Sequence, residues 1–183
     1  MDERIKNNNI RIMILTGLMI ALTFVAGSVI KIPTLNGFIQ LGDCMVLLGV
    51  VLLGKKRGAL SGAIGMILVD ITGGYLIWAP FTFVIKGAMA YFTGVILDGV
   101  KEKKHITYLI AFITGGIINV FGYFIGNMII GGIIIGTVSG LIPSFIYAGT
   151  LVLGDSLQSI VGIIIALILA PITYKAKLKF NLL

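Results

Sequence analysis

Four ionisable side chains interrupt otherwise apolar stretches of the sequence, and their positions define the chemistry available to the chain. They are three acids and one base: Asp43, Asp70, Asp155 and Lys86. A charge at the centre of a bilayer costs about 2.5–3.5 kcal/mol on insertion scales, so such a residue indicates a functional site. The structural alternative is a buried ion pair that locks helices together, formed by Lys86 with either Asp70 or Asp43.

Uncharged polar and aromatic side chains accompany these charges. Asn119, Tyr123 and Asn127 recur at four-residue intervals and would share one helix face, and Gln158 lies one turn from Asp155. Together they predict a polar, aromatic-walled substrate site whose members are Asn36, Gln40, Asp43, Asp70, Tyr75, Trp78, Lys86, Asn119, Tyr123, Asn127, Asp155 and Gln158. Tyr and Trp are also common at membrane interfaces, and Asn also bonds neighbouring membrane helices, so both structural roles stay open.

The composition excludes a water-soluble protein. Of the 183 residues, 58% are hydrophobic and 11% are charged, against about 25% charged in soluble domains. The mean hydropathy of +1.11 also excludes a disordered chain. The formal charge of +7 does not indicate nucleic-acid binding, because the bases are not spread over a soluble face. The sequence therefore predicts a single integral membrane domain over residues 1–183.

Hydropathy and basic clusters together predict the topology. Apolar stretches predict an all-α protein with six transmembrane helices at about 10–30, 38–54, 58–76, 79–99, 106–128 and 150–174. Twelve of the 14 Lys and Arg residues fall in four clusters, near residues 4–11, 55–57, 101–104 and 175–179. Bases mark the cytoplasmic side. We therefore expect both termini in the cytoplasm of a multi-pass cell-membrane protein, with external connections at 31–40, 73–79 and about 129–149, the last a loop or re-entrant segment.

Common catalytic machinery is missing from the sequence. The chain has one cysteine, Cys44, and one histidine, His105, so neither an internal disulfide nor a cysteine metal cluster can form. The H-E-x-x-H, G-x-S-x-G and Walker patterns are absent. We expect neither an enzyme nor a cofactor or metal. Uphill transport would need an ion gradient or a separate ATPase.

Three stretches resemble the substrate-binding S components of energy-coupling-factor (ECF) vitamin transporters. They are TGLMIALTFVAGSVIKIP, NGFIQLGDCMVLLGVVLLGKKRGALSG and DITGGYLIWAPFTFVIKGAMAYFTG. The first has small residues at four-residue spacing, Gly17 and Ala21. The second and third stretches are similar to two patterns of one subgroup of S components, G-x-I-x-L-G-D and D-x-x-x-G-Y…A-P-x-T…K-G. The resemblance covers most of residues 10–100.

The resemblance implies high-affinity binding of a vitamin or precursor at the outer face, with residues 31–40 as a lid. It implies docking through Gly17 and Ala21 onto a transmembrane T protein that carries two ATPase subunits. Similar members take pyridine, pyrimidine or flavin-like compounds. Two other classes remain open: a stand-alone carrier with Asp70 or Asp155 as proton relay, and a small intramembrane enzyme, which no motif supports.

Overall fold

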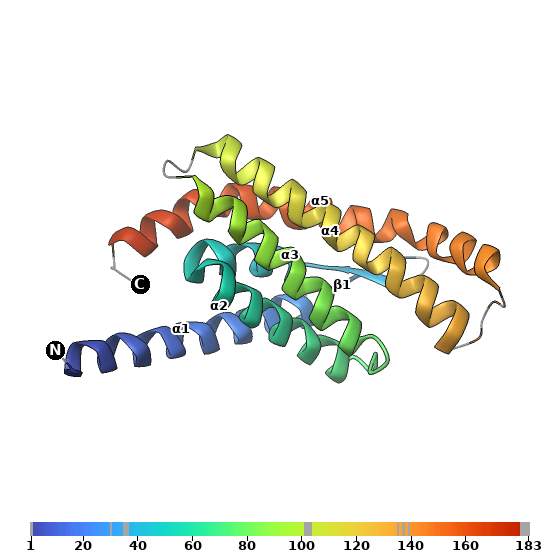
Figure 1. Ribbon diagram of the computed structural model, residues 1–183, viewed down its shortest axis with the longest axis horizontal. Helices are drawn as coiled ribbons and strands as arrows, with labels where there is room; N and C mark the ends of the chain where they lie inside the picture. Colours follow the sequence, from blue (N-terminus) through green and yellow to red (C-terminus); the bar gives the residue numbers. More distant parts are fainter. Residues whose placement is uncertain are drawn as a thin grey trace.

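The chain folds into a bundle of long helices with a short β-hairpin (Figure 1). The computed structural model describes residues 2–29, 31–34, 37–100, 104–134 and 140–179, together with residues 136 and 138. The elements are α1 (Asp2–Val29), β1 (Lys31–Thr34), β2 (Gly37–Gln40), α2 (Gly42–Thr72), α3 (Ala79–Gly99), α4 (His105–Ile129), the π-helical turn η1 (Ile130–Ile134) and α5 (Leu141–Lys179). The helical class predicted from hydropathy is confirmed.

Four helical stretches in the described part are long and apolar enough to cross a membrane. They are Asn9–Val29, Ala79–Gly99, His105–Gly132 and Leu141–Lys179. The outward sides of these helices are apolar, as at Met13 (68% exposed) and Leu141 (83% exposed). Apolar side chains that face outward along whole helices suit lipid rather than water.

Helix α2 is folded back on itself at Gly54. Gly54 has φ 77° and ψ 176°, a backbone conformation that side chains rarely adopt. The two halves on either side pack together, because a Cβ added at Gly58 would lie 2.6 Å from Val50 Cα. A Cβ added at Gly62 would likewise lie 2.8 Å from Val46 Cγ1. The residues expected in two separate helices thus form two antiparallel helical halves that are joined by a turn at Gly54.

Two segments expected as external connections contain regular structure. Residues 31–34 and 37–40 form an antiparallel hairpin in which Lys31 pairs with Gln40 and Thr34 with Gly37. The expected connection at 129–149 is helical at both ends, since η1 follows α4 and α5 begins at Leu141. The glycines and Pro143 suggested a loop, but proline is tolerated in a first helical turn. Ser144 Oγ donates to the Gly140 carbonyl at 2.8 Å, within the same turn.

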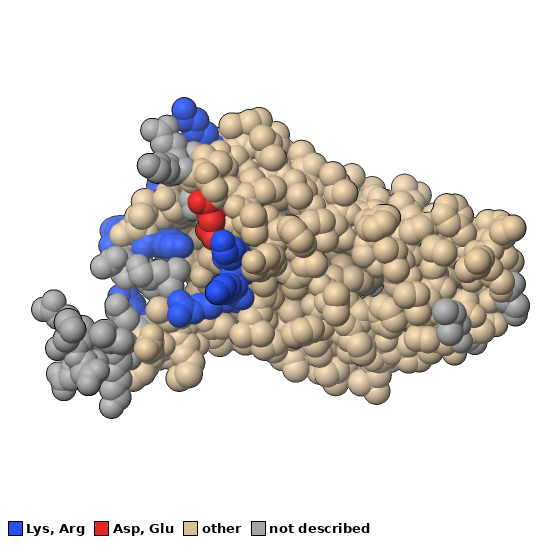
Figure 2. All heavy atoms as spheres, viewed as in Figure 1, with Lys and Arg blue, Asp and Glu red and all other residues tan. Residues whose placement is uncertain are grey.

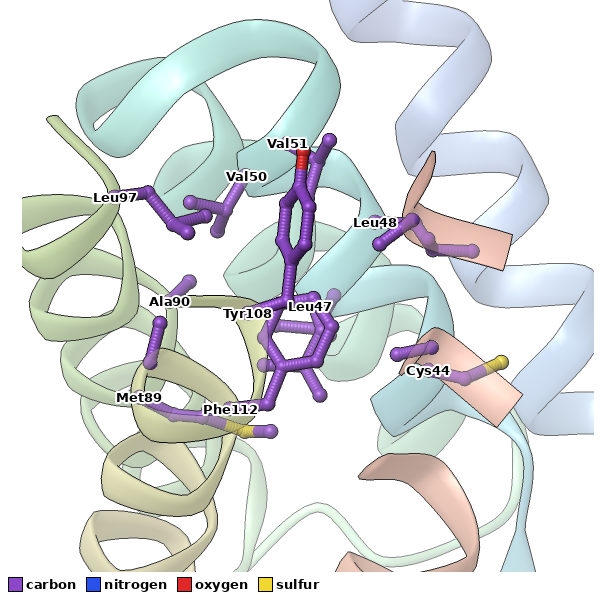
Figure 3. Close-up of a cluster of buried hydrophobic side chains, with 14 of the residues drawn as sticks. Cys44, Leu47, Leu48, Val50, Val51, Met89, Ala90, Leu97, Tyr108 and Phe112 are labelled. Carbon is purple, nitrogen blue, oxygen red and sulfur yellow. The ribbon is translucent and has the colours of Figure 1, made fainter. Parts of the chain in front are cut away.

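The apolar core lies between α2, α3 and α4, with alanines of α5 closing one side. Figure 3 shows Leu47, Met89 and Phe112 interlocking there, and each is fully buried. Cys44 lies at the edge of this cluster, where its Sγ donates to the Leu41 carbonyl at 2.9 Å. This core fixes α2 and α3 against α4 and therefore positions the polar residues that continue from it.

The exposed charges gather at one end of the molecule. Figure 2 shows Lys and Arg side chains at one end of the visible face, with other residue types over the rest of it. Helix α1 begins and α5 ends at this same end (Figure 1). Lys55 there pairs with Asp98 at 3.3 Å. The distribution is that of a membrane protein with one basic, water-facing end.

Candidate functional site

Two helices face each other with matching polar and aromatic stripes. Trp78, the N-cap of α3, is followed at four-residue intervals by Thr82 and Lys86 on that helix. Helix α4 carries Asn119, Tyr123 and Asn127 at the same interval. The stripes run antiparallel: Lys86 meets Asn119, and Thr82 meets Tyr123. Four-residue spacing keeps each set on one helix face, so the helices present a continuous polar column to the bundle interior.

A buried ion pair forms the inner end of this column. Lys86 Nζ donates to Asp43 Oδ1 at 2.5 Å and to Asn119 Oδ1 at 2.8 Å. All three side chains are 0% exposed. The ammonium also lies 4.9 Å from the Tyr123 ring centroid, a cation–π distance. Asp43 lies in the first turn of α2, where the helix dipole stabilises a carboxylate.

Helix α5 completes the network. Gln158 Nε2 donates to Asp43 Oδ2 at 3.0 Å, and Asn119 Nδ2 donates to Ser159 Oγ at 2.9 Å. Asn119 Nδ2 also lies 3.4 Å from Asp43 Oδ2. The network therefore joins α2, α3, α4 and α5. Because both charged groups have charged and amide partners, the desolvation of the pair is offset within the protein.

The other end of the column is aromatic and carries a second carboxylate. The rings of Trp78 and Tyr123 lie 6.3 Å apart at 45°, and Tyr123 Oη lies 3.2 Å from Thr82 Oγ1. Asn127 Nδ2 donates to Asp155 Oδ2 at 3.4 Å. Asn127 is buried, and Asp155 is half-buried. Aromatic faces beside amide and carboxylate groups suit a small planar compound that offers polar edges.

The remaining predicted site residues make no hydrogen bond described above to the column. Asp70 is buried near the end of α2, and its carbonyl accepts the backbone N–H of Tyr75 at 2.8 Å. Tyr75 is exposed in the turn that follows. Gln40 is buried, with Oε1 2.8 Å from the position of a Cβ added at Gly27 on α1. Gln40 thus packs toward α1 rather than toward Lys86. Asn36 lies outside the described residues.

Two hydroxyl residues of the network were not predicted from the sequence. Thr82 lies four residues from both Trp78 and Lys86, and Ser159 lies four residues from Asp155. Extending the four-residue spacing from the predicted residues would have found both. Small hydroxyls are common in membrane helices, however, and alone carry little signal.

The small residues of α1 face outward. Gly17 and Ala21 are exposed, and a Cβ added at Gly17 would meet no atom within 4 Å. Leu18, Leu22 and Val25 flank them and are between 41% and 51% exposed. This side of α1 is therefore an apolar surface open to lipid or to a partner helix.

The fold and column together define a multi-pass membrane protein with a polar interior, in the manner of transport proteins. A family model for the S component of the ECF-type riboflavin transporter matches residues 7–176, and the chain belongs to this family. The family consists of transporter components rather than enzymes. The resemblance noted over residues 10–100 is confirmed and extends over nearly the whole chain.

Two relatives add to this assignment. The chain is 30% identical over 169 residues to the thiamine precursor transporter HmpT of Lactococcus lactis, a match that covers 91% of this chain and 89% of that protein. It is 38% identical over 94 residues to an uncharacterized protein of Pyrococcus woesei. That second match spans 51% of this chain and 62% of the Pyrococcus protein.

Proposed function

We propose that this protein binds a water-soluble vitamin or vitamin precursor at the outer membrane face and serves as the S component of an ATP-driven ECF transporter. The observation that carries the proposal is the polar column in the bundle of a chain that belongs to the S-component family. A polar column of this kind is costly in lipid, which favours a ligand-binding role.

The proposed topology has six crossings, with both termini in the cytoplasm of a cell-membrane protein. Helices α1, α3, α4 and α5 each supply one crossing, and the two halves of α2 supply a helical pair. The basic end carries the start of α1, the end of α5 and the α2 turn at Lys55–Arg57, which supports its assignment to the cytoplasm. Asp155, Asn127 and Trp78 then lie on the outer side of the Lys86 network.

In this arrangement the substrate rests above the Lys86–Asp43–Asn119 network. A planar ring would stack against Trp78 and Tyr123 and exchange hydrogen bonds with Asn127, Asp155 and Gln158. The family is named for riboflavin transport, and one relative is named for transport of a thiamine precursor. Riboflavin and a thiamine precursor are therefore both candidate substrates. Pyridine compounds fit the same kind of site.

The proposed partners are a transmembrane T protein and two ATPase subunits. No phosphate-binding loop occurs in the sequence, so ATP hydrolysis must come from another chain. The exposed Gly17 and Ala21 supply the docking surface, since small residues let a partner helix approach closely.

The direct test is to identify small molecules that co-purify with the protein and then measure their affinity. Mass spectrometry of the denatured native protein should release a vitamin or precursor, and titration calorimetry should give one site per chain. Uptake into liposomes should require the T protein and ATPases. Proton-driven uptake by the purified chain alone would instead favour a stand-alone carrier.

A further inference from the structure

Asp155 differs from Asp43 and Asp98 in the way that its charge is balanced. Asp43 is paired with Lys86, and Asp98 is paired with Lys55. Among the described residues, no cation lies within salt-bridge distance of Asp155. Its one hydrogen bond there comes from Asn127 at 3.4 Å. A carboxylate offers about four lone-pair sites, so this contact leaves most of its accepting capacity unused.

The surroundings of Asp155 suit a flat aromatic ligand. Asn127, its partner, lies one helical turn from Tyr123 on α4, and Tyr123 lies beside Trp78. The Trp78 ring lies 3.7 Å from the position of a Cβ added at Gly126, the neighbour of Asn127. The Asp155 carboxylate and the two rings therefore converge on the same part of α4.

The network beneath this place is electrically balanced. Lys86 and Asp43 offset one another at 2.5 Å, so an incoming anion would have to compete with Asp43 for the ammonium. Asp155 then adds to the described column a carboxylate that takes part in no salt bridge with another described residue. At the low dielectric of a bundle interior, a negative group attracts a cation or N–H donor and repels an anion more strongly than in water.

We propose that Asp155 is the charge-selecting residue of the substrate site, where it accepts N–H hydrogen bonds from a protonatable amino-heterocycle and rejects anionic forms of the same compounds. This inference rests on the proposed function and narrows its substrate class. Aminopyrimidines offer an exocyclic amine and a protonatable ring nitrogen. Pyridine carboxylates and phosphate esters carry the wrong charge, and a flavin ring offers one imide N–H and no cation.

The test compares four probes with the purified full-length chain: 4-amino-5-hydroxymethylpyrimidine, its phosphate monoester, pyridine-3-carboxylate and riboflavin. Titration calorimetry gives the affinities. Quenching of Trp78, the single tryptophan, reports binding near the rings. We expect the aminopyrimidine to bind at least about 10-fold more tightly than its phosphate ester, and Asp155→Asn to weaken its binding by about 10-fold to 100-fold. Asp98→Asn, at the basic end, is the matched control and should change affinity by less than about 2-fold.

The outcomes separate this inference from the proposed function. Riboflavin binding that is tight and equal in the wild type and Asp155→Asn would overturn the inference and leave the proposed function standing. Binding of none of the probes to the wild-type protein would count against both. If Asp155→Asn fails to fold, the affinities of the wild-type protein for the aminopyrimidine and for its phosphate ester provide the test. Equal affinities for the two compounds would overturn the inference.

Discussion

Lys86 illustrates how a single buried residue can support both the fold and the proposed substrate site. Its ammonium is fully buried and bonded to Asp43 and Asn119, so it stabilises contacts among three helices before any ligand arrives. Removing one partner of a buried pair leaves the other charge uncompensated in a medium of low dielectric. The residue therefore belongs to the floor of the proposed site, and its loss should be felt first as lost stability.

Lys86→Met should destabilise the protein by about 3–5 kcal/mol, because Asp43 would remain charged and buried without its cation. Asp43→Asn introduced into the Lys86→Met protein should restore part of this loss, since the stranded charge is removed. Thermal unfolding in detergent micelles measures both effects. Lys56→Met, at an exposed base, is the control and should change stability by no more than about 0.5 kcal/mol. Unfolding of Lys86→Met at the wild-type temperature would show that the pair does not support the fold.

At the scale of elements, the fold-back of α2 places Asp43 beside Lys86. The turn depends on the positive φ of Gly54, and the contact between the halves depends on Gly58. Gly58 permits an approach that any side chain would block, because Val50 backbone atoms occupy the place of its Cβ. The fold-back of α2 thus depends on Gly54 for its backbone conformation and on Gly58 for the absence of a side chain.

Gly58→Ala should destabilise the protein by about 1–3 kcal/mol, since the added methyl would lie 2.6 Å from Val50 Cα and 2.8 Å from its backbone nitrogen. The matched control is Gly149→Ala on α5, where a Cβ would meet no atom within 4 Å. That change should be neutral or slightly stabilising. Thermal unfolding of the two variants side by side provides the measurement, and equal stabilities would refute close packing of the α2 halves.

The sequence predicted the elements better than the pairings between them. Hydropathy located the helices, and the four-residue spacing of Asn119, Tyr123 and Asn127 predicted their shared face. The partner of Lys86 was not determined, because 43 residues and a fold-back separate it from Asp43. The early start of α5 was missed, since glycines and Pro143 are common in loops as well as in first turns. The hairpin at residues 31–40 was missed because strands of four residues carry little periodic signal.

At the scale of the whole molecule, one side of α1 is left open while the rest of the bundle encloses the polar column. Gly17 and Ala21 lie on this open side with apolar neighbours. The column and the α1 surface are carried by different helices, since α2, α3, α4 and α5 supply the network. Ligand binding and partner docking should therefore be separable by mutation.

Gly17→Leu should leave ligand affinity within about 2-fold of wild type and abolish co-purification with the T protein, because the added side chain fills the surface that a partner helix would approach. Gly149→Leu, at an equally open position on α5, is the control and should retain the partner. Pull-down of the assembled complex and calorimetry on the isolated chain measure the two properties. Association that survives Gly17→Leu would remove this part of α1 from the docking interface.

The fold-back of α2 also constrains how the protein enters the membrane during synthesis. Its halves, Gly42–Leu53 and Lys55–Thr72, are about 18 Å and 27 Å long at 1.5 Å per residue, and the hydrocarbon core is about 30 Å thick. Each half also carries an acid at the end away from the turn, Asp43 or Asp70. Neither half is thus a good independent insertion signal, whereas α1 and α3 are. We therefore expect α2 to insert as a pre-paired hairpin between α1 and α3, and the Asp43–Lys86 bond to form only after α3 has been synthesised.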